Sequence, residues 1–521
     1  MTTDSLPALR TYLRAESELR RGEFTRALES YQETVALDPE FALAWYRLSV
    51  AAEWSAQNDL VGPAVAKALE FQDRLSEHDR HLLEARLANR RGDPLRAEDI
   101  YRSILGRYPD DVEAWVQLSE ILSHYNYMTG RSMTAAREAP EGGLPSEPAC
   151  IGAWWHLARV AAVEGDAAEV DAIVERILEL NPEGERALEM EILRAVALGD
   201  DAELAALLRQ LESVEDHVIS LTAWGLAMTQ TDPSSAIRVL EVLTRPSRSD
   251  EARALGFETL GWLHAAAGRL EVALDELRRA GEISTPRRLE SEPLIRLLPW
   301  VPFHEERVRR LRRELLDWDA GAERPSTNPT NFFRQHNGIH ELLRAYLIEM
   351  LDARLGDAPA TGEASRLSAA VARLPDGIEK SLGGFLQDSL RAYRAFLAGA
   401  MESVLRIHAA AQFSWAYQDA YASPFYGMTF DRWLRAEALR ESGRTDEALV
   451  WYSTFGEISF HDEAFLGPAS FRRAEILQRR GETAEAARYY RLVTELWSEA
   501  DAALEPWVEA SREELERLAG D

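Results

Sequence analysis

Two pairs of histidines are the first residues whose spacing could support chemistry. His336 and His340 lie four residues apart, a spacing that places two side chains on one face of a helix where they could share a metal ion. His340 also begins a sequence like the zinc-protease motif H-E-x-x-H, but Arg344 stands where the second histidine would be. His78 and His81 are three residues apart and have no third ligand nearby. We therefore predict surface or packing roles for these histidines and no metal site.

Other catalytic patterns are missing from the sequence. It contains no G-x-S-x-G nucleophile motif, phosphate-binding or dinucleotide-binding glycine loop, and neither the His-Arg-Asp nor the Asp-Phe-Gly triplet of protein kinases. The single cysteine, Cys150, cannot form an intrachain disulfide or a thiolate cluster, and it fits a reducing compartment. These observations predict a protein that is not an enzyme and holds no cofactor.

Composition and net charge indicate a folded, acidic protein. The 521 residues are 46% hydrophobic and 28% charged, which is enough apolar material for a core. A formal net charge of −29 opposes binding to a phosphate backbone. No window approaches 18 uninterrupted apolar residues, and the N-terminus lacks the features of a signal peptide. We expect an acidic, cytoplasmic protein without nucleic-acid or membrane partners.

Glycines mark the turns between the predicted helices. A Gly followed by a polar residue recurs at gaps that are often close to one or two units of about 34 residues. Such a glycine fits the left-handed position that ends one helix before a tight turn into the next. The eight glycines are Gly22, Gly92, Gly165, Gly199, Gly268, Gly356, Gly443 and Gly481.

Small and aromatic residues follow these turns at a fixed spacing. An alanine and a tyrosine four residues apart share one helical face, where the small residue allows close helix approach. The pairs are Ala27 with Tyr31, Ala97 with Tyr101, Ala448 with Tyr452 and Ala486 with Tyr490. Prolines then end several second helices, and a Trp opens the next unit, as at Trp45, Trp115 and Trp154.

This pattern resembles the tetratricopeptide repeat over the whole chain. The resemblance implies an all-α fold, a right-handed superhelical solenoid of antiparallel helix pairs. Three stretches, residues 108–115, 437–452 and 489–501, are also similar to the tetratricopeptide regions carried C-terminal to bacterial serine/threonine kinases and related signalling regulators. We expect this chain to begin in its first repeat, without a kinase domain ahead of it.

Three segments interrupt the pattern. Residues 138–148 carry many Pro and Gly residues, which predicts an exposed loop. Residues 286–303 hold a largely apolar run that we interpret as a filler packed between two sub-arrays, with a docking epitope as the alternative. The predicted parts are an N-terminal array of residues 1–318, a linker of residues 319–330, and a C-terminal array of residues 331–521 with a capping helix at residues 501–518.

The resemblance also implies which residues face the concave groove. Positions one, five and eight after the Trp slot line the groove in this family, and here they hold aromatic and polar residues. None is the Lys or Asn of a clamp for a C-terminal carboxylate. The candidates for partner binding are Tyr12, Tyr46, Val50, Trp54, Val116, Glu120, His124, Trp155 and Arg159. The alternative is that these rings only pack between repeats.

A second aromatic patch lies near a Pro/Gly turn. It contains Phe413, Trp415, Tyr417, Phe425 and Tyr426. This patch is either a recognition loop or a repeat junction filled with rings, and we favour the junction.

The leading hypothesis for function is a non-catalytic scaffold or adaptor in bacterial signalling or complex assembly. It would bind a protein segment, either a helix or an extended peptide, in the groove. The alternatives are a regulator that responds to a small ligand or peptide, and a permanent subunit of a larger complex. The sequence leaves the partner and the oligomeric state open.

Overall fold

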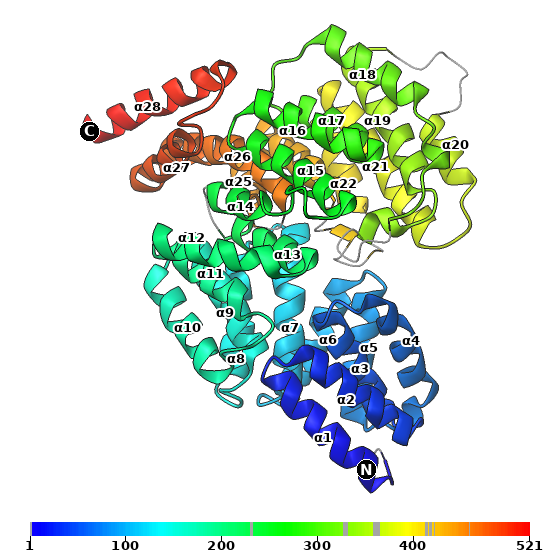
Figure 1. Ribbon diagram of the computed structural model, residues 1–521. Coiled ribbons are helices and arrows are strands. Elements are labelled where there is room, and N and C mark those ends of the chain that lie inside the picture. Colours follow the sequence, from blue (N-terminus) through cyan, green and yellow to red (C-terminus); the bar gives the residue numbers. More distant parts are fainter. Residues whose placement is uncertain are drawn as a thin grey trace. The chain divides into compact units, whose positions relative to one another are not determined.

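The computed structural model is built from helices (Figure 1). It describes residues 3–229, 233–326, 332–357, 365–411, 415, 419–420, 423–457 and 459–520. Within these ranges every regular element is a helix, which confirms the predicted all-α helical-repeat fold. The residues group by their contacts into two compact units. Unit 1 contains residues 1–126 and 133–207, and unit 2 contains residues 127–132 and 208–521.

Unit 1 is a series of helices joined by short turns. The helices are α1 (Leu6–Arg20), α2 (Phe24–Leu37), α3 (Ala42–Trp54), α4 (Asn58–Glu70), α5 (Glu77–Arg90), α6 (Pro94–Arg107), α7 (Val112–Tyr125), α8 (Glu138–Gly143), α9 (Ile151–Glu164), α10 (Ala167–Leu180), α11 (Ala187–Ala197) and the start of α12 (Asp201–Gln210). Helices α1, α3, α5 and α9 each pack against the helix that follows. These are the antiparallel pairs that the sequence predicts.

Unit 2 repeats this arrangement. Its α-helices are α13 (Asp216–Ala227), α14 (Ser234–Leu240), α15 (Asp250–Ala266), α16 (Leu270–Ile283), α17 (Thr285–Arg296), α18 (Glu305–Asp317), α19 (Ile339–Leu355), α20 (Arg366–Ala372), α21 (Ile378–Leu397), α22 (Met401–Ala410), α24 (Thr429–Glu441), α25 (Thr445–Tyr452), α26 (Phe460–Arg479), α27 (Thr483–Leu496) and α28 (Glu505–Gly520). A short 3₁₀ turn, η6 (Phe332–Gln335), precedes α19.

The chain of unit 2 folds back on itself. Helix α26 packs on α15 as well as on α27. Trp497 donates its indole N–H to the carbonyl of Ala266 at 2.9 Å, and the backbone N–H of Asp501 bonds to the carbonyl of Gly268 at 3.0 Å. The α26–α27 pair is therefore held against the turn between α15 and α16.

Left-handed glycines make the turns between helices. All eight predicted turn glycines have φ between 66° and 78°. A side chain is strained in this conformation, which costs roughly 1–2 kcal/mol. At the end of α9, for example, Gly165 has φ 76° and is the C-cap. The predicted turn positions are confirmed.

A side-chain hydrogen bond links each of these tryptophans to the chain that precedes its helix. Trp45, Trp115 and Trp154 each donate an indole N–H to a carbonyl six residues earlier, at 2.8, 2.8 and 2.9 Å. The acceptors are Pro39, Pro109 and Pro148. The bond ties the incoming chain to the first turn of the helix, and because its acceptor is a main-chain carbonyl it fixes the position of the tryptophan and does not itself require a proline.

Residues 138–148 differ from the exposed loop that their composition predicts. Residues 138–143 form the short helix α8, which packs against α7 and α9. Pro140 lies in its first turn, where no backbone donor is needed. Gly142 permits close packing, because a Cβ there would lie 2.6 Å from the Trp115 ring. For residues 138–143 the loop prediction is wrong, since the glycine makes room for a ring.

The apolar run within residues 286–303 is buried in unit 2. Leu294, Ile295 and Leu298 are among the core residues, and the first part of the run is helix α17. Trp300 donates its indole N–H to the carbonyl of Ala464 at 2.8 Å. The run therefore packs inside the solenoid, and these side chains are not exposed for docking.

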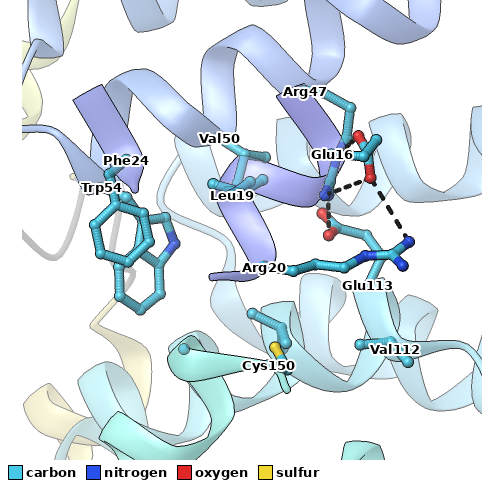
Figure 2. Close-up of a pocket in the computed structure, with 12 residues that line it drawn as sticks. Glu16, Leu19, Arg20, Phe24, Arg47, Val50, Trp54, Val112, Glu113 and Cys150 are labelled. Carbon is cyan, nitrogen blue, oxygen red and sulfur yellow. Dashed lines mark hydrogen bonds and ion pairs between the residues drawn. The ribbon is translucent and has the colours of Figure 1, made fainter. Parts of the chain in front are cut away.

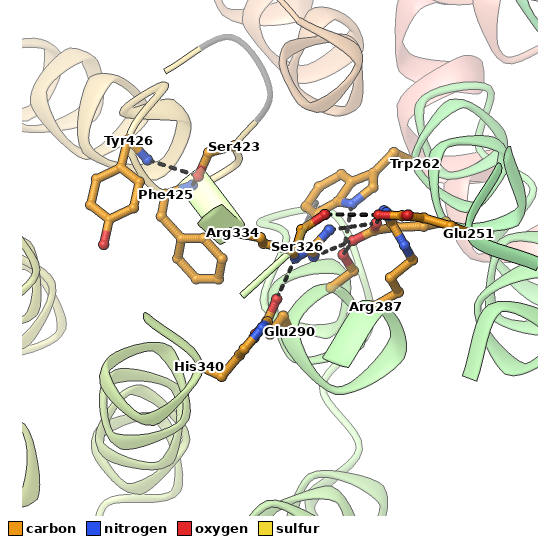
Figure 3. Close-up of polar contacts among 12 residues, drawn as sticks. Glu251, Trp262, Arg287, Glu290, Ser326, Arg334, His340, Ser423, Phe425 and Tyr426 are labelled. Atoms are coloured by element: carbon orange, nitrogen blue, oxygen red, sulfur yellow. Dashed lines mark hydrogen bonds and ion pairs between the residues drawn. The ribbon is translucent and has the colours of Figure 1, made fainter. Parts of the chain in front are cut away.

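A buried ion network joins α15, α17, η6 and α19 (Figure 3). Arg334 donates to Glu258 and to Glu290, each at 2.7 Å. Glu258 also accepts from Arg287 at 2.7 Å, and His340 lies 2.5 Å from Glu290. Burial alone would raise the pKa of Glu258, but Arg334 and Arg287 outweigh it and hold the pKa at about 2. The charges in this network therefore stay ionised and paired.

This network joins residues before the predicted linker, residues 319–330, to residues after it. Residues on both sides of 319–330 belong to unit 2, and the contacts divide the chain near residue 207 instead. Residues 327–330 of that segment lie outside the described part of the chain.

Buried arginine–carboxylate pairs recur at one-repeat spacing in both units. Each joins the first helix of one pair to the first helix of the next, with partners 29 to 31 residues apart. The pairs are Arg47 with Glu16, Arg159 with Glu189, Arg287 with Glu258, and Arg432 with Asp462. A planar guanidinium offers several fixed donors to a carboxylate, which suits these buried positions better than an ammonium.

The last helix, α28, covers the end of the solenoid. Leu515 and Leu518 pack against the buried Tyr489 and Tyr490 of α27. The opposite side carries charged, exposed residues such as Glu513. This is the arrangement expected of a capping helix.

Candidate functional site

The predicted groove residues lie on the first helices of unit 1. Helix α1 carries Tyr12, α3 carries Tyr46, Val50 and Trp54, α7 carries Val116, Glu120 and His124, and α9 carries Trp155 and Arg159. Five of these residues are buried, namely Tyr46, Val50, His124, Trp155 and Arg159. The other four are half-buried. Most of the predicted groove residues are therefore covered by other side chains of the protein.

Two of the predicted tyrosines pack between repeats. The Tyr12 ring lies 5.9 Å from the Tyr31 ring and 5.0 Å from the Phe41 ring. Tyr46 donates its hydroxyl to Glu113 at 2.8 Å. For these two residues the observed contacts match the packing alternative.

Trp155 and Arg159 also face inward. The Arg159 guanidinium lies 3.8 Å from the centroid of the Trp155 ring, a cation–π contact. Arg159 also donates to Glu189 at 2.8 Å, which links α9 to α11. These contacts occupy the guanidinium within unit 1.

A serine, a histidine and a carboxylate lie in line between α7 and α9. The Ser123 hydroxyl is 3.2 Å from Nδ1 of His156, and Nε2 of His156 is 2.8 Å from Glu120. Burial lowers the pKa of His156, so we assign a neutral ring that donates from Nε2 and accepts at Nδ1. Ser123 is only 3% exposed, so a substrate cannot reach its hydroxyl in this structure. The three residues form a buried hydrogen-bond network.

A pocket lies between helices of unit 1 (Figure 2). It is bordered by α1, the start of α2, α3, α7 and the start of α9, and its volume is about 510 Å³ including the open space at its mouth. An aromatic pair lies at one end and a charged cluster at the other. The lining residues are Glu16, Leu19, Arg20, Phe24, Arg47, Val50, Trp54, Val112, Glu113, Val116, Cys150 and Gly152.

The aromatic end is formed by Phe24 and Trp54. Their rings are stacked, with centroids 4.8 Å apart and an interplanar angle of 24°. Trp54 also contacts Trp155 and His156 edge to face, at 5.7 and 6.0 Å. Since Trp54 is only half-buried, part of its surface remains available to the pocket.

The charged end is built around Arg47. Arg47 donates to Glu16 at 2.7 Å and also pairs with Glu113. Tyr31 donates its hydroxyl to Glu16 at 2.5 Å. Burial would raise the pKa of Glu16, but Arg47 outweighs it and lowers that pKa. Glu16 is therefore ionised beside the buried guanidinium, and Glu113 pairs with the same group.

Contacts at the mouth of the pocket join segments distant in sequence. Arg20, whose side chain is 48% exposed, forms an ion pair with Glu147 at 3.0 Å. The Asn181 amide donates to the carbonyl of Arg21 at 2.8 Å, and the backbone N–H of Thr25 donates to Glu185 at 2.8 Å. The turn between α1 and α2 is thus fastened to segments before α9 and after α10.

Only part of this lining was predictable from the repeat pattern. The pattern predicted Val50, Trp54 and Val116, which line the pocket. It missed Arg47 and Glu113, although Arg47 is a charged residue in the otherwise mostly apolar helix α3. The remaining missed residues are Glu16, Leu19, Arg20, Phe24, Val112, Cys150 and Gly152.

The second aromatic patch is buried where the structure describes it. Phe413 and Tyr417 lie outside the described residues. Trp415, Phe425 and Tyr426 are buried. Their rings pack against Phe333, Tyr346 and Phe385. Ser423 accepts hydrogen bonds from the backbone N–H groups of Phe425 and Tyr426 (Figure 3). These contacts match a ring-filled junction.

The histidine pairs make separate polar contacts. His336 lies 2.9 Å from Asp419 and precedes α19, whereas His340 lies in α19 and pairs with Glu290. His78 contacts Asp111 and Asp79. Across the described ranges, no group of three or more His, Cys, Asp or Glu side chains is placed to hold a metal ion. Among the described helices none is long and apolar enough to cross a membrane.

Comparison with known proteins supports a helical repeat of the tetratricopeptide type. The profile of the tetratricopeptide repeat family matches residues 12–74, from the middle of α1 to just beyond α4. Repeats of this type form scaffolds for protein–protein interaction. A search of curated proteins found no match.

Solved helical-repeat structures are similar to this chain at low identity. The Cut9–Hcn1 heterotetramer of the APC/C is 12% identical, over 98% of this chain and 77% of that one, with a TM-score of 0.36. The tetratricopeptide domain of P58(IPK) is 14% identical over 98% and 99%, with a TM-score of 0.20. Naa15/Naa10 bound to HypK is 12% identical over 99% and 67%, with a TM-score of 0.21.

Proposed function

We propose that this protein is a non-catalytic scaffold that binds a segment of another protein in the pocket of unit 1. The observation that carries the proposal is the pocket itself, which combines a stacked aromatic pair with a charged end between helices of unit 1. The proposal includes a cytoplasmic location. The resemblance to kinase-associated tetratricopeptide regions supports a role in bacterial signalling or complex assembly.

The pocket suits a single anchoring side chain better than a whole helix. Most of the predicted groove residues, such as Tyr46 and Trp155, are already covered by other side chains, so a long segment has little room along them. A buried Leu or Phe side chain would contribute roughly 1.5–3 kcal/mol. We therefore expect an extended peptide that inserts one apolar residue.

Gly152 provides a way to test the pocket. A Cβ at this position would lie 3.5 Å from the Trp54 ring, an ordinary contact, so Gly152→Ala fits. A larger side chain in Gly152→Leu would occupy the pocket. The full tagged chain would be purified from its own host as wild type and as both variants, and the proteins that elute with it would be quantified by mass spectrometry.

A partner retained by Gly152→Ala and lost by Gly152→Leu would support the proposal. Equal recovery by both variants would move the binding site away from the pocket. Recovery of no partner by the wild type would count against the scaffold.

A ligand-responsive regulator is the second candidate, favoured by the contacts at the mouth. A ligand that displaces Arg20 from Glu147 would loosen the attachment between the α1–α2 turn and the segment before α9. Hydrogen exchange of residues 18–25 and 144–152, with and without a metabolite extract of the host, tests this candidate. Unchanged exchange would count against it.

A further inference from the structure

Two arginines of unit 2 share an environment that recurs from one helix pair to the next. The guanidinium of Arg435 in α24 lies 4.1 Å from the centroid of the Trp451 ring in α25. That of Arg473 in α26 lies 4.0 Å from the centroid of the Tyr489 ring in α27. Each arginine precedes its ring by 16 residues, so the two pairs occupy equivalent positions of consecutive repeats.

Neither of these guanidiniums has a carboxylate partner. Among the described residues, Arg435 and Arg473 make no hydrogen bond and no ion pair. Arg432, one turn earlier in α24, is instead paired with Asp462, like the other buried arginines of the first helices. A guanidinium has five N–H donors in a fixed fork, and for Arg435 and Arg473 none of them meets an acceptor of the protein.

The two guanidiniums cover their rings but remain accessible themselves. Trp451 is only 6% exposed and Tyr489 only 8% exposed, whereas Arg435 and Arg473 are half-buried. The nitrogen atoms of the two arginines are not among the enclosed atoms that lack a partner, so solvent reaches them. Burial lowers the pKa of both side chains, because each guanidinium has lost part of its hydration without gaining an anion.

The carboxylates that act on these two arginines are bound by other side chains. Arg444 donates to both oxygens of Glu447, at 2.7 and 2.6 Å. Glu485 pairs with another arginine at 3.6 Å, and Glu457 accepts from the Ser132 hydroxyl at 2.8 Å. The feature that marks this surface is therefore a pair of guanidiniums with unfilled donors, and not an excess of positive charge.

We propose that Arg435 and Arg473 form a docking surface for an acidic segment of a partner protein, with one Asp or Glu carboxylate bound by each guanidinium. Arginine and carboxylate match in geometry, since two parallel N–H groups of the fork can meet the two oxygens. The stacked ring holds each guanidinium in place before the segment binds, which lowers the entropy lost on binding. This surface belongs to unit 2, so it is a second site in addition to the pocket of unit 1.

The repeat spacing indicates how the acidic residues of the segment are arranged. Helices α24 and α25 both contact α26, and packed helices are about 8–10 Å apart. In an extended segment of the polyproline type, residues three apart lie on the same side and about 9 Å from each other. We therefore expect two acidic residues at positions i and i+3 of an extended segment.

The acidic charge of the whole chain does not prevent such an encounter. The formal net charge is −29, but exposed charges are screened beyond about 8 Å at physiological ionic strength. Two carboxylates also bring far less charge than the phosphate backbone of a nucleic acid. The surface therefore suits a short acidic segment better than a polyanion, and its affinity should fall as salt is added.

Synthetic peptides test the proposal on the full chain. The probe is a fluorescein-labelled peptide of twelve residues, Pro and Ala with two Glu three residues apart, and its Kd is measured by fluorescence anisotropy. The comparison peptides carry two Gln in place of the Glu residues, two adjacent Glu residues, or two phosphoserines three residues apart. We expect the peptide with Glu at i and i+3 to bind at least about 10-fold more tightly than the Gln peptide and the adjacent-Glu peptide.

Single variants locate the binding on the protein. Arg435→Gln and Arg473→Gln should each weaken binding of the Glu peptide about 5- to 10-fold. Arg279→Gln is the matched control, because Arg279 is also half-buried and lies 4.0 Å from the centroid of the Phe257 ring, but it donates to Glu276 at 2.9 Å. This control should change Kd less than about 2-fold. Circular dichroism and thermal melting check that each variant folds, and the Gln peptide tests the charge without altering the protein.

Several outcomes would overturn the proposal. No binding of the Glu peptide, or equal affinity for the Glu and Gln peptides, would exclude a carboxylate-binding surface. Equal affinity for the spaced and adjacent Glu peptides would exclude one carboxylate per repeat. An effect of Arg279→Gln as large as those of Arg435→Gln and Arg473→Gln would leave only general attraction. Binding of the phosphoserine peptide alone would assign the surface to phosphate in place of acidic residues.

Discussion

Both units carry Arg–Glu pairs on the first helices of their helix pairs, but the pairs differ in how far they are enclosed. In unit 1, Glu16 and Glu113 flank Arg47 at the edge of a pocket and keep part of their surface exposed. In unit 2, Glu258 and Glu290 are buried and fully enclosed by arginines, a serine and a histidine. The same pairing of Arg with Glu therefore lines a pocket in one unit and is part of the core in the other.

The two clusters differ in how completely other side chains enclose their carboxylates. Unit 2 completes its network with Arg334, which enters from η6 and reaches two carboxylates. In unit 1 the second guanidinium of the pocket lining, that of Arg20, lies 3.9 Å from Glu16 and stays 48% exposed. We therefore expect changes in the enclosed network of unit 2 to lower stability more than changes at the pocket of unit 1.

Removal of the inserted guanidinium should be the most damaging change. Arg334→Leu leaves two carboxylates buried without their shared partner, which typically costs about 3–5 kcal/mol. Urea unfolding would measure the loss. Arg324→Leu, at an exposed position nearby, is the control and should change stability by less than about 0.5 kcal/mol. A loss below about 1 kcal/mol for Arg334→Leu would show that the network is not a core element.

The turn that closes unit 2 should tolerate a side chain poorly. At Gly268, φ is 76° and a Cβ would lie 2.5 Å from Leu504 and 2.6 Å from Ala500. Gly268→Ala should therefore cost about 3 kcal/mol, since strain and overlap add. Gly443 has the same φ of 76° with nothing within 4 Å. Gly443→Ala should cost only about 1 kcal/mol in the same urea-unfolding measurement. Equal losses of stability in the two variants would mean that the turn at Gly268 is not tightly packed.

Acidification should destabilise unit 2 through His461. Burial lowers the pKa of this imidazole to about 3, so the folded state holds it neutral while the unfolded state gains a proton below about 6.5. The contribution of the neutral imidazole to folding stability is complete above pH 6.5 and is lost as the pH falls toward 3. Between pH 7 and 5 this amounts to about 2 kcal/mol. Denaturation at both pH values should show a smaller drop for His461→Gln than for wild type.

The smallest effect is expected at the mouth of the pocket. Arg20 is exposed, and surface ion pairs contribute only about 0–1 kcal/mol. Arg20→Ala should leave global stability within about 0.5 kcal/mol while raising hydrogen exchange in residues 144–152. A large loss of global stability would mean that the charged cluster of unit 1 is as important to the core as that of unit 2, and the two units would then not differ in this respect.

The sequence predicted the parts of the fold that local rules control. The turn glycines and the Ala–Tyr pairs depend on backbone conformation and helical spacing, so they can be recognised from a few neighbouring residues. The short helix α8 was missed because its proline and glycines favour a loop by composition. Only contact with the Trp115 ring reveals why glycine is required at position 142.

The pocket was less predictable, because it depends on which distant side chains meet. Tyr46 and Trp155 fit the groove pattern, yet the structure buries both against residues of other helices. Phe24 follows a turn glycine and gives no local sign that it will stack on Trp54. Arg47 and Glu16 belong to a pairing with a spacing of about one repeat, a signal that is present in the sequence but visible only once the first helices are aligned.

The attachment of Asn181 to Arg21 and of Glu185 to Thr25 spans 160 residues in each case. An open solenoid can fray from either end, because each repeat depends only on its neighbours. Unit 1 instead ties a late segment to its first turn, which resists such fraying and adds contacts between residues far apart in sequence. We therefore expect unit 1 to melt in one cooperative transition, and to fold more slowly than an open array of repeats of the same length.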